Sequence, residues 1–427
     1  MKKRIPALLL ALTLCFTLFG CASPSGSDAP SGSSPGTSPG GSSPSDSTPA
    51  EVKDVHLRVW GAEEDQVMLK SMLDAFADAN KAQINFTYDL GVQGEGGTKD
   101  TVLVDIEAAA DVYAFAHDQI GELYKAGALQ EVLDNVADIK SRNVSSSVEA
   151  ATVDGKLMAY PMTADNGYFM FYNSSYFTED DVKSFDGMLA KAEAAGKKIS
   201  MELTSGWYNY AFFKAGGLNA SLNDDGVTND CDWNGPGGTD VLQAMLDLAK
   251  HPAFVSLGSD EFKAGVIDGS VIAGVSGTWN AGAVAEAWGE SYAASKLPTV
   301  AIAGEQKQLG SFSGYKLIGV NAFCQETGWA MRLADYLTNY DNSLRRFNER
   351  QQGPSNTLAA ASDAVKSDPA QLAIATQMQF ATPQIIGGNY WSPAQTLGEI
   401  IVQGNPSGTP LQTLLDNAVA GITAPVG

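Results

Sequence analysis

Carboxylate and aromatic side chains are concentrated at a few points of this 427-residue chain. Glu64 and Asp65 belong to an acidic run, and Asp118 follows a histidine. The densest aromatic cluster consists of Trp207, Tyr208 and Tyr210. Carboxylates accept hydrogen bonds from hydroxyl groups, whereas flat rings cover apolar C–H surfaces. A site with both kinds of side chain suits a ligand that has polar edges and apolar faces.

His117-Asp118 is also a pair that a catalytic site could use. It would need a nucleophile, and no G-x-S-x-G motif or paired cysteine accompanies it in the segments that we expect to fold. Asp118 could instead cap its loop. The acidic run with Glu64 and Asp65 could simply begin a helix, because acidic residues are favoured in a first turn.

The aromatic cluster can be interpreted in two ways. A strand would place Trp207 on one face and Tyr208 and Tyr210 on the other, whereas a helix would spread them. Gly206, just before the cluster, indicates a loop that opens onto a cleft. Packing in a core is the alternative role for these rings.

The elements around the acidic groups predict a parallel sheet. Alternating residues over 55–60 and β-rich segments over 84–90 and 111–116 predict three strands. Apolar residues spaced i, i+3, i+4, i+7 between 69 and 76 predict a helix, and a second helix is expected over 98–110. Strands that alternate with helices form parallel sheets, and ligands bind beyond the carboxyl ends of such strands. The loops 61–66 and 117–119 are therefore favoured positions for a site.

The rest of the chain continues this mixed α/β pattern. Further strands are expected over 157–161, 167–172 and 271–275. Further helices are expected over 240–250, 328–338, 343–351, 370–380, 394–403 and 411–420. The acidic stretch 223–232 lacks the twelve-residue register of a calcium loop and predicts a polar β-hairpin turn.

The N-terminus reads as an export signal. A basic start and an apolar run too short to span a membrane make up residues 1–20. Gly20-Cys21 resembles a lipobox, so we expect Cys21 to carry a lipid; an ordinary secretory cleavage is the alternative. Residues 22–50 contain 11 Ser, 6 Pro and 5 Gly, so 21–51 is expected to be a tether.

Composition excludes several classes of function. The net charge is −22, which argues against nucleic acid as a partner because nucleic acid requires a basic patch. Four cysteines and three histidines are too few for a disulfide scaffold or a zinc module, so we expect no metal and no cofactor. The length suggests two or more domains, and 44% hydrophobic residues can fill their cores.

Three stretches of the chain carry a family resemblance. They are 110–129 with its A-H-D motif, 153–162 with D-G-K-L-M-A-Y-P followed by Phe171-Tyr172-Asn173, and Val275-Ser276-Gly277-Thr278-Trp279. From about Val52 to the C-terminus, the chain resembles the extracellular solute-binding proteins of carbohydrate ABC importers, of the maltose/maltodextrin-binding type. The lipoprotein start resembles the Gram-positive members of that family.

The resemblance implies an α/β fold of two lobes, like the periplasmic binding proteins, with a hinged cleft between the lobes. The expected N-lobe comprises 52–162 and 312–355. The expected C-lobe comprises 163–311 and 356–427. Cys231 and Cys324 then lie in different lobes, where a disulfide would oppose closure, so we expect two free and mostly buried thiols.

The resemblance also implies roles for acidic residues in sugar binding. Asp118 would accept hydrogen bonds from sugar hydroxyls, and Glu64 and Asp65 occupy binding positions, although the family member compared has lysine at the second of these. Asp165 stands where the family has a longer glutamate that grips hydroxyls. Gln119 replaces a family arginine.

For the aromatic residues, the resemblance implies stacking against sugar rings. Trp279 corresponds to a stacking platform, and Tyr390 and Trp391 correspond to a pair that stacks from the C-lobe. Trp207 retains an aromatic position, and Phe115 replaces a tryptophan. Packing in the core is the alternative for each. Trp233, Trp288 and Trp329 are expected to be structural.

The expected function is that of a monomeric, lipid-anchored receptor on the outer face of the cell membrane. It would capture a neutral oligosaccharide such as maltose or maltodextrin by hinge closure and deliver it to the membrane permease of an ABC importer, without catalysis. Alternatives are a receptor for another neutral sugar, such as a xylo- or galacto-oligosaccharide, a surface starch adhesin, and a glycosidase, although no pair of acids is singled out for hydrolysis.

Overall fold

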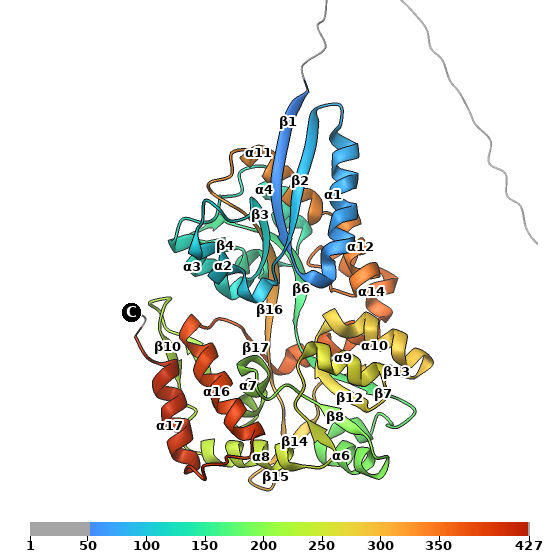
Figure 1. Ribbon diagram of the computed structural model, residues 1–427, viewed down its shortest axis with the longest axis vertical. Coiled ribbons are helices and arrows are strands. Elements are labelled where there is room, and N and C mark those ends of the chain that lie inside the picture. The colour runs from blue at the N-terminus through green and yellow to red at the C-terminus, as the bar shows by residue number, and fades with distance from the viewer. Residues whose placement is uncertain (1–51, 426–427) are drawn as a thin grey trace, which may run out of the picture. The chain divides into compact units, whose positions relative to one another are not determined.

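A computed structural model describes residues 52–425 of the chain. The expected signal peptide over 1–20, the lipidated Cys21 and the tether over 21–51 lie outside the described residues. Residues 52–425 form one compact unit, in which two lobes each contain a sheet covered by helices (Figure 1). In these residues no helix is both long and apolar enough to cross a membrane.

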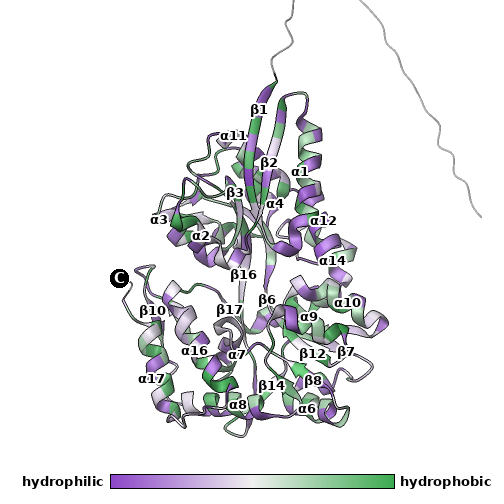
Figure 2. Cartoon of the chain, viewed as in Figure 1, coloured by the Kyte–Doolittle hydropathy of each residue, from purple (hydrophilic) through white to green (hydrophobic). Residues whose placement is uncertain are grey.

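A six-stranded mixed sheet with the order β17-β16-β3-β1-β2, in which β6 also pairs with β16, forms the N-lobe sheet and extends along β16 to β17 on the C-lobe side (Figure 1). Its strands are β1 (Lys53–Gly61), β2 (Ile84–Val92), β3 (Val112–Ala116), β6 (Tyr160–Gly167), β16 (Ser311–Val320) and β17 (Ala381–Pro383). β1 is parallel to both β2 and β3, which confirms the predicted parallel arrangement. Buried and exposed residues alternate along β1, as do hydrophobic and hydrophilic ones (Figure 2).

Helices surround this sheet in the N-lobe (Figure 1). They are α1 (Gln66–Asn80), α2 (Thr98–Val104), α3 (Ile120–Lys125), α4 (Val136–Arg142), α5 (Ser145–Ala150), α11 (Thr327–Leu337) and α12 (Tyr340–Arg350). The predicted face of α1 is buried through Leu69, Met72, Leu73 and Phe76. α2 ends six residues before the predicted end at 110. Asp105 is extended and its carboxylate accepts a hydrogen bond from the Ala108 backbone N–H at 3.1 Å, which competes with helical hydrogen bonds.

The C-lobe has a five-stranded sheet with the order β11-β8-β12-β7-β13. Its strands are β7 (Phe169–Asn173), β8 (Lys198–Ser200), β11 (Phe254–Val255), β12 (Val271–Ser276) and β13 (Tyr292–Ser295). Its helices are α6 (Phe185–Ala194), α7 (Gly206–Ala215), α8 (Gly238–Lys250), α9 (Ser259–Ile267), α10 (Ala281–Trp288), α15 (Pro369–Gln377), α16 (Trp391–Val402) and α17 (Leu411–Ile422). The short α13 (Thr357–Ala360) and α14 (Asp363–Ser367) precede α15.

Three small hairpins complete the fold. They are β4 (Thr152–Val153) with β5 (Lys156–Leu157), β9 (Ala220–Leu222) with β10 (Asn229–Cys231), and β14 (Thr299–Ile302) with β15 (Glu305–Gln308). The β9–β10 hairpin confirms the turn expected within 223–232. The strand predicted over 157–161 is wrong in its bounds, because the chain ends one hairpin at Leu157 and begins β6 at Tyr160.

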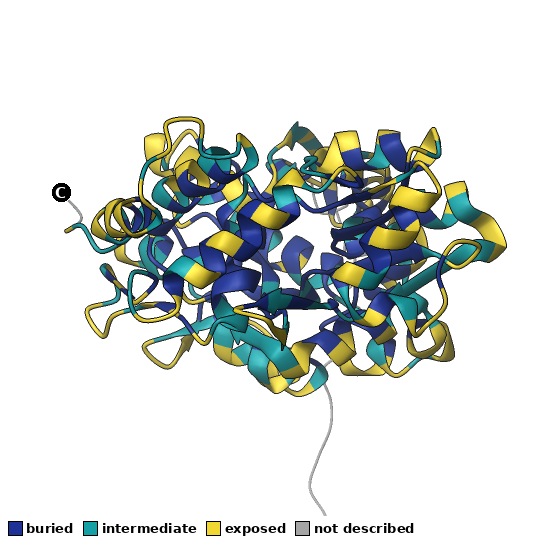
Figure 3. Ribbon diagram, turned by 90° about the horizontal axis from the view of Figure 1, so that it is seen from below, coloured by how far each residue is buried: buried dark blue, intermediate teal, exposed yellow. Residues whose placement is uncertain are grey.

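The two lobes have separate hydrophobic cores. The N-lobe core draws its buried residues from 55–162 and 317–337, whereas the main C-lobe core draws them from 168–312 and 386–422. Seen from below, buried residues fill the interior of the body and exposed residues cover its outer helices (Figure 3). Cys231 lies in the C-lobe core and Cys324 in the N-lobe core; both are buried, free thiols, as expected.

Antiparallel strands connect the lobes. β6 and β16 pair with each other from Tyr160–Ile318 to Gly167–Ser313, and both run between the lobes (Figure 1). The register shifts twice along this pair, between Gly314 and Lys316 and between Lys316 and Leu317. Such irregularities bend a strand pair locally, which places the bend beside Lys316.

Candidate functional site

A cavity of about 1050 Å³ is lined by residues of both lobes. On the N-lobe side, its lining residues follow the carboxyl ends of β1, β2 and β3. They are Ala62, Glu63 and Glu64 after β1, Gly94, Glu95 and Gly96 after β2, and Ala116, Asp118 and Gln119 at or after β3. The cavity therefore lies where a parallel sheet places ligands.

The C-lobe side of the cavity presents three tryptophans. Trp207 comes from the start of α7, Trp279 from the 3₁₀ turn η5 (Thr278–Asn280) and Trp391 from the start of α16. The ring centroids of Trp207 and Trp279 are 5.6 Å apart with an interplanar angle of 39°. All three side chains are partly exposed, so their rings are available to a ligand.

A helix, and not a loop, positions Trp207. Ser205 caps α7 by accepting a hydrogen bond from the Trp207 backbone N–H at 3.3 Å, and Gly206 begins the helix. The helix places Trp207, Tyr208 and Tyr210 on different faces, which agrees with the helical interpretation of this cluster and not with the strand. Gly206 must lack a side chain because an added Cβ would lie 2.8 Å from the Cβ of Ala394.

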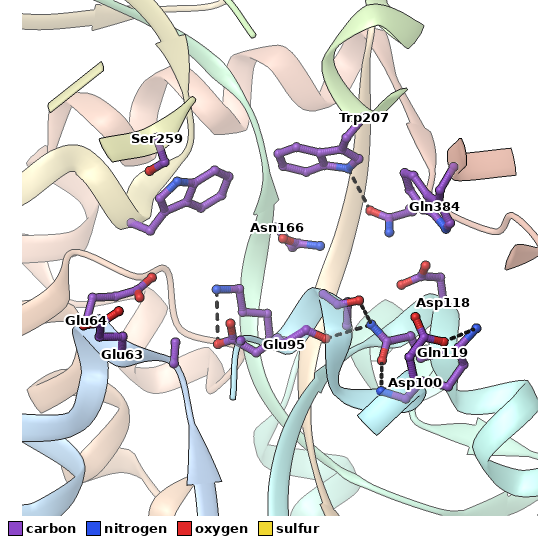
Figure 4. Close-up of a pocket in the computed structure, with 18 of the residues that line it drawn as sticks. Glu63, Glu64, Glu95, Asp100, Asp118, Gln119, Asn166, Trp207, Ser259 and Gln384 are labelled. Atoms are coloured by element: carbon purple, nitrogen blue, oxygen red, sulfur yellow. Dashed lines mark hydrogen bonds and ion pairs between the residues drawn. The ribbon is translucent and has the colours of Figure 1, made fainter. Parts of the chain in front are cut away.

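Asp118 is one of the N-lobe carboxylates on the lining, and in Figure 4 it lies on the opposite side of Gln384 from Trp207. Burial raises the pKa of its carboxyl group to about 6, and the nearby Gln384 side chain opposes this shift. Its Oδ1 atom is buried without a hydrogen-bond partner among the described residues. An acceptor without a partner is costly, so a ligand hydroxyl that donates to this carboxylate from the cavity would be favourable.

Gln384 joins the lining from the segment after β17. Its Oε1 atom accepts a hydrogen bond from Trp207 Nε1 at 2.9 Å (Figure 4). Gln384 was not predicted as a site residue, because no motif or periodicity in the sequence around it singles it out. Glu95 was also missed, although it follows the second predicted strand, where the same strand-end rule applies.

Each cation on the lining has an acidic partner. Lys99 pairs with Glu122 at 3.0 Å, Lys263 with Asp260 at 2.8 Å, Lys316 with Glu95 at 3.3 Å and Arg350 with Asp65 at 2.9 Å. In contrast, Glu63, Glu64 and Asp118 have no ion-pair partner within residues 52–425. The cavity therefore carries excess negative charge, which disfavours an anionic ligand.

Five of the eleven expected binding residues line this cavity. They are Glu64, Asp118, Trp207, Trp279 and Trp391. The other six, which are Asp65, Phe115, Asp165, Tyr208, Tyr210 and Tyr390, are buried away from the lining.

Asp65 is the centre of a buried ion-pair cluster. Its carboxylate accepts hydrogen bonds from Arg346 at 3.3 Å, Arg350 at 2.9 Å and Gln352 at 3.3 Å. Burial lowers the pKa of the Arg346 guanidinium, and the charge of Asp65 opposes this shift. The structure therefore gives Asp65 the task of fastening α12 and the following segment to the start of α1.

Asp165 lies where β6 enters the C-lobe. It accepts hydrogen bonds from Thr278 Oγ1 at 2.6 Å and from the Gly353 backbone N–H. Thr278 is adjacent to Trp279, so Asp165 supports the turn that carries this ring. In this structure Asp165 therefore binds Thr278 and Gly353 and does not line the cavity, whereas the resemblance implies a direct contact between this residue and sugar hydroxyls.

The four buried aromatic residues pack behind the lining. Phe115 is in the N-lobe core, and Tyr210 stacks on Phe312 with ring centroids 3.9 Å apart. The Tyr390 hydroxyl donates to the Gly206 carbonyl at 2.7 Å. The ring centroids of Tyr208 and Trp207 are 5.1 Å apart. The three tyrosines therefore support the tryptophans that reach the cavity, whereas Phe115 is a core residue of the other lobe.

A two-lobe α/β fold with a ligand-sized cavity lined by both lobes defines the class of solute-binding proteins. Comparison with known sequences agrees: the chain belongs to the family of bacterial extracellular solute-binding proteins, whose family model matches residues 71–373. The galactooligosaccharide-binding protein of Bacillus subtilis (strain 168) is 26% identical over 431 residues, covering 95% of this chain and 93% of that protein.

Solved structures are similar over the same body. A structure solved with acarbose has 34% sequence identity and a TM-score of 0.78, covering 87% of this chain and 99% of the other. The maltotriose-binding protein of Thermus thermophilus, bound with maltotriose, has 21% identity and a TM-score of 0.75, covering 87% of this chain and 100% of the other. The second likeness confirms the two-lobe fold.

Proposed function

We propose that this protein captures a neutral oligosaccharide for an ABC importer. The observation that carries the proposal is the pairing of three tryptophans on one wall of the cavity with an unpaired carboxylate acceptor, Asp118, on the other. Tryptophan faces cover the C–H faces of sugar rings, and the carboxylate accepts from a hydroxyl. Every lining cation is already paired, which leaves no free positive charge for an acidic sugar.

The size of the cavity supports an oligosaccharide ligand. Its volume of about 1050 Å³ is at the upper end of the range of roughly 300–1,000 Å³ for small-molecule sites. The relatives support the same class of ligand, since their names or bound ligands include galactooligosaccharide, acarbose and maltotriose. We take maltose or maltodextrin as the leading ligand and a galacto-oligosaccharide as the alternative.

Hinge closure would be the working motion. The N-lobe would comprise 52–162 and 312–355, and the C-lobe 163–311 and 356–427, with movement at the β6–β16 crossing. A ligand that contacts both walls stabilises the closed state by its differential affinity. The closed complex would then dock, as a monomer, on the membrane permease.

The place of action follows from the N-terminus. We propose that cleavage after residue 20 leaves Cys21 as a lipidated N-terminus, and that 21–51 tethers the body to the outer face of the cell membrane. Buried acyl chains contribute about 0.8 kcal/mol for each CH₂ group. Mass spectrometry of the membrane fraction tests this, since a Cys21→Ser protein should lose the lipid and be released.

Binding without catalysis is part of the proposal, because the family and the relatives are binding proteins. Incubation with maltoheptaose should release no reducing ends, and steady turnover would instead indicate a glycosidase.

Calorimetric titration of residues 52–427 tests the ligand. The panel should contain maltose, maltotriose, acarbose, galacto-oligosaccharides, xylo-oligosaccharides and a galacturonate oligomer as the anionic comparison. Micromolar binding of α-glucans supports the leading ligand, and a response to galacto-oligosaccharides alone would replace it. Silence to every neutral sugar would refute the proposed function.

A further inference from the structure

Gln384 occupies the junction between the two walls of the cavity. It follows β17 directly, and only 5% of its surface is exposed. Its backbone N–H donates to the Ser313 carbonyl on β16 at 2.8 Å, which fixes the main chain at this point. The side chain is held between Trp207 of α7 and Asp118 of η3 (His117–Gln119), as Figure 4 shows.

The chemistry of its neighbours fixes the orientation of the amide group. An indole N–H is only a donor, so the oxygen of Gln384 must face Trp207, where the distance is 2.9 Å. The amide nitrogen therefore points away from the indole, where its two N–H groups can donate. A carboxylate is only an acceptor, and Asp118 Oδ1 still lacks a partner among residues 52–425.

We propose that Gln384 is a positioning and specificity-determining residue of the binding site. Its oxygen holds the Trp207 ring in the orientation needed for stacking, and its amide N–H groups form a donor beside the Asp118 acceptor. Two neighbouring hydroxyls of one sugar unit match this pair: one donates to the Asp118 carboxylate and the other accepts from Gln384 Nε2. This role rests on the proposed function and specifies the hydroxyl pattern that the site recognises.

The pKa of the Asp118 carboxyl group depends on the charged groups around it, so a new charge at position 384 should change how sugar binding varies with pH. Besides Gln384, Lys99 of α2 lowers the pKa of the Asp118 carboxyl group, whereas Glu122 of α3 and, most strongly, burial raise it. Lys99 is itself paired with Glu122 and Asp100. A second carboxylate at position 384 would lie next to Asp118 (Figure 4) and would make the two acids share a proton.

The test compares two variants of nearly equal size. Gln384→Glu keeps an acceptor for the Trp207 indole and replaces the donor by a carboxylate, whereas Gln384→Leu removes both functions. Gln243→Glu, on the exposed face of α8, adds the same charge far from the cavity and is the matched control. Circular dichroism and thermal unfolding identify any variant that fails to fold.

Titrations use whichever of maltotriose, acarbose and galactotriose binds the unchanged protein, between pH 5 and pH 8. Gln384→Glu should bind at least about tenfold more weakly at pH 8 and recover as the pH falls towards 5, because protonation restores a donor. The unchanged protein and Gln243→Glu should show the opposite trend. Parallel pH profiles in all three proteins would overturn the specificity role, while the proposed function would stand.

Tryptophan emission of the ligand-free protein tests positioning independently. The emission of Trp207 is the part of the spectrum that is lost in Trp207→Phe. Gln384→Leu should shift the wavelength of this part, whereas Gln384→Glu should leave it close to that of the unchanged protein. Identical spectra for Gln384→Leu and the unchanged protein would overturn the positioning role. If no sugar binds the unchanged protein, the proposed function fails and the specificity role fails with it, but the emission result still decides whether Gln384 holds Trp207.

Discussion

The ammonium group of Lys316 lies 5.7 Å from the centre of the Trp279 ring. Lys316 is a buried residue of β16 and pairs with Glu95 at 3.3 Å, whereas Trp279 belongs to the C-lobe wall of the cavity. A cation over an indole face is attracted by the ring quadrupole. The positive charge of Lys316 therefore attracts one face of the Trp279 ring. Lys316 lies on β16, the strand that runs between the lobes, where the register with β6 shifts between Gly314 and Leu317.

Trp279→Ala should weaken sugar binding by about 2 kcal/mol or more, roughly thirtyfold, because it removes a stacking surface on the cavity wall. Calorimetry with the sugar that the panel identifies measures the change. Trp288→Phe is the control, since Trp288 packs at the end of α10 outside the lining. Equal losses in both variants would indicate damage to the C-lobe and not loss of a ligand contact.

Sugar affinity should decrease as the pH falls below about 6. The carboxylate form of Asp118 accepts the ligand hydroxyl, and its pKa of about 6 means that protonation removes this acceptor at mildly acidic pH. Well below that pKa, the decrease should approach roughly tenfold for each pH unit. Asp118→Asn should bind weakly and show a flat profile between pH 4.5 and 8. A steep profile in this variant would assign the titration to another group.

Asp118→Asn should stabilise the ligand-free protein at pH 7–8. The folded-state pKa of Asp118, about 6, is above its value of 3.8 in the unfolded chain, so the folded state binds the proton more tightly. This group therefore destabilises the fold by up to about 3 kcal/mol above pH 6, and the penalty disappears as the pH falls from about 6 towards 4. Thermal unfolding at pH 8 and pH 4 should show a gain only at pH 8.

Asp65→Ala should reduce stability far more than it reduces the affinity of the molecules that remain folded. Removal of the carboxylate leaves Arg346 buried without its partner, at a cost of about 3–5 kcal/mol. Urea unfolding measures the loss, and titration at low temperature measures the affinity. Glu64→Ala, at the neighbouring exposed position, should leave stability nearly unchanged. A large loss of affinity in Asp65→Ala with normal stability would restore a direct binding role.

Both thiols of the folded body should react slowly with alkylating reagents at pH 8. Burial raises the pKa of Cys231 and of Cys324 to about 12, so little of the reactive thiolate is present. Mass spectrometry should find almost no label on residues 52–427 in the native state and two labels after unfolding without a reductant. The absence of any label after unfolding would reveal a disulfide between the two cysteines.

Local sequence patterns predicted much of the N-lobe. Alternation over 55–60 and the apolar spacing between 69 and 76 identified β1 and the buried face of α1, because these patterns depend only on backbone periodicity. The strand-end rule then placed Glu64 and Asp118 at the cavity. The same periodicity could not show that Asp105 would end α2 early, since that depends on a competing side-chain hydrogen bond.

The residue types by themselves determined that the site would combine carboxylates with aromatic rings, and motif resemblance indicated the family. Only the tertiary structure decided which of these residues reach the cavity. Asp65 and Asp165 are turned into buried contacts with Arg346 and Thr278, partners more than 100 positions away in the chain. Gln384 reaches Trp207 across 177 positions. Such pairings arise when separate segments fold against one another, so no local pattern in the sequence contains them.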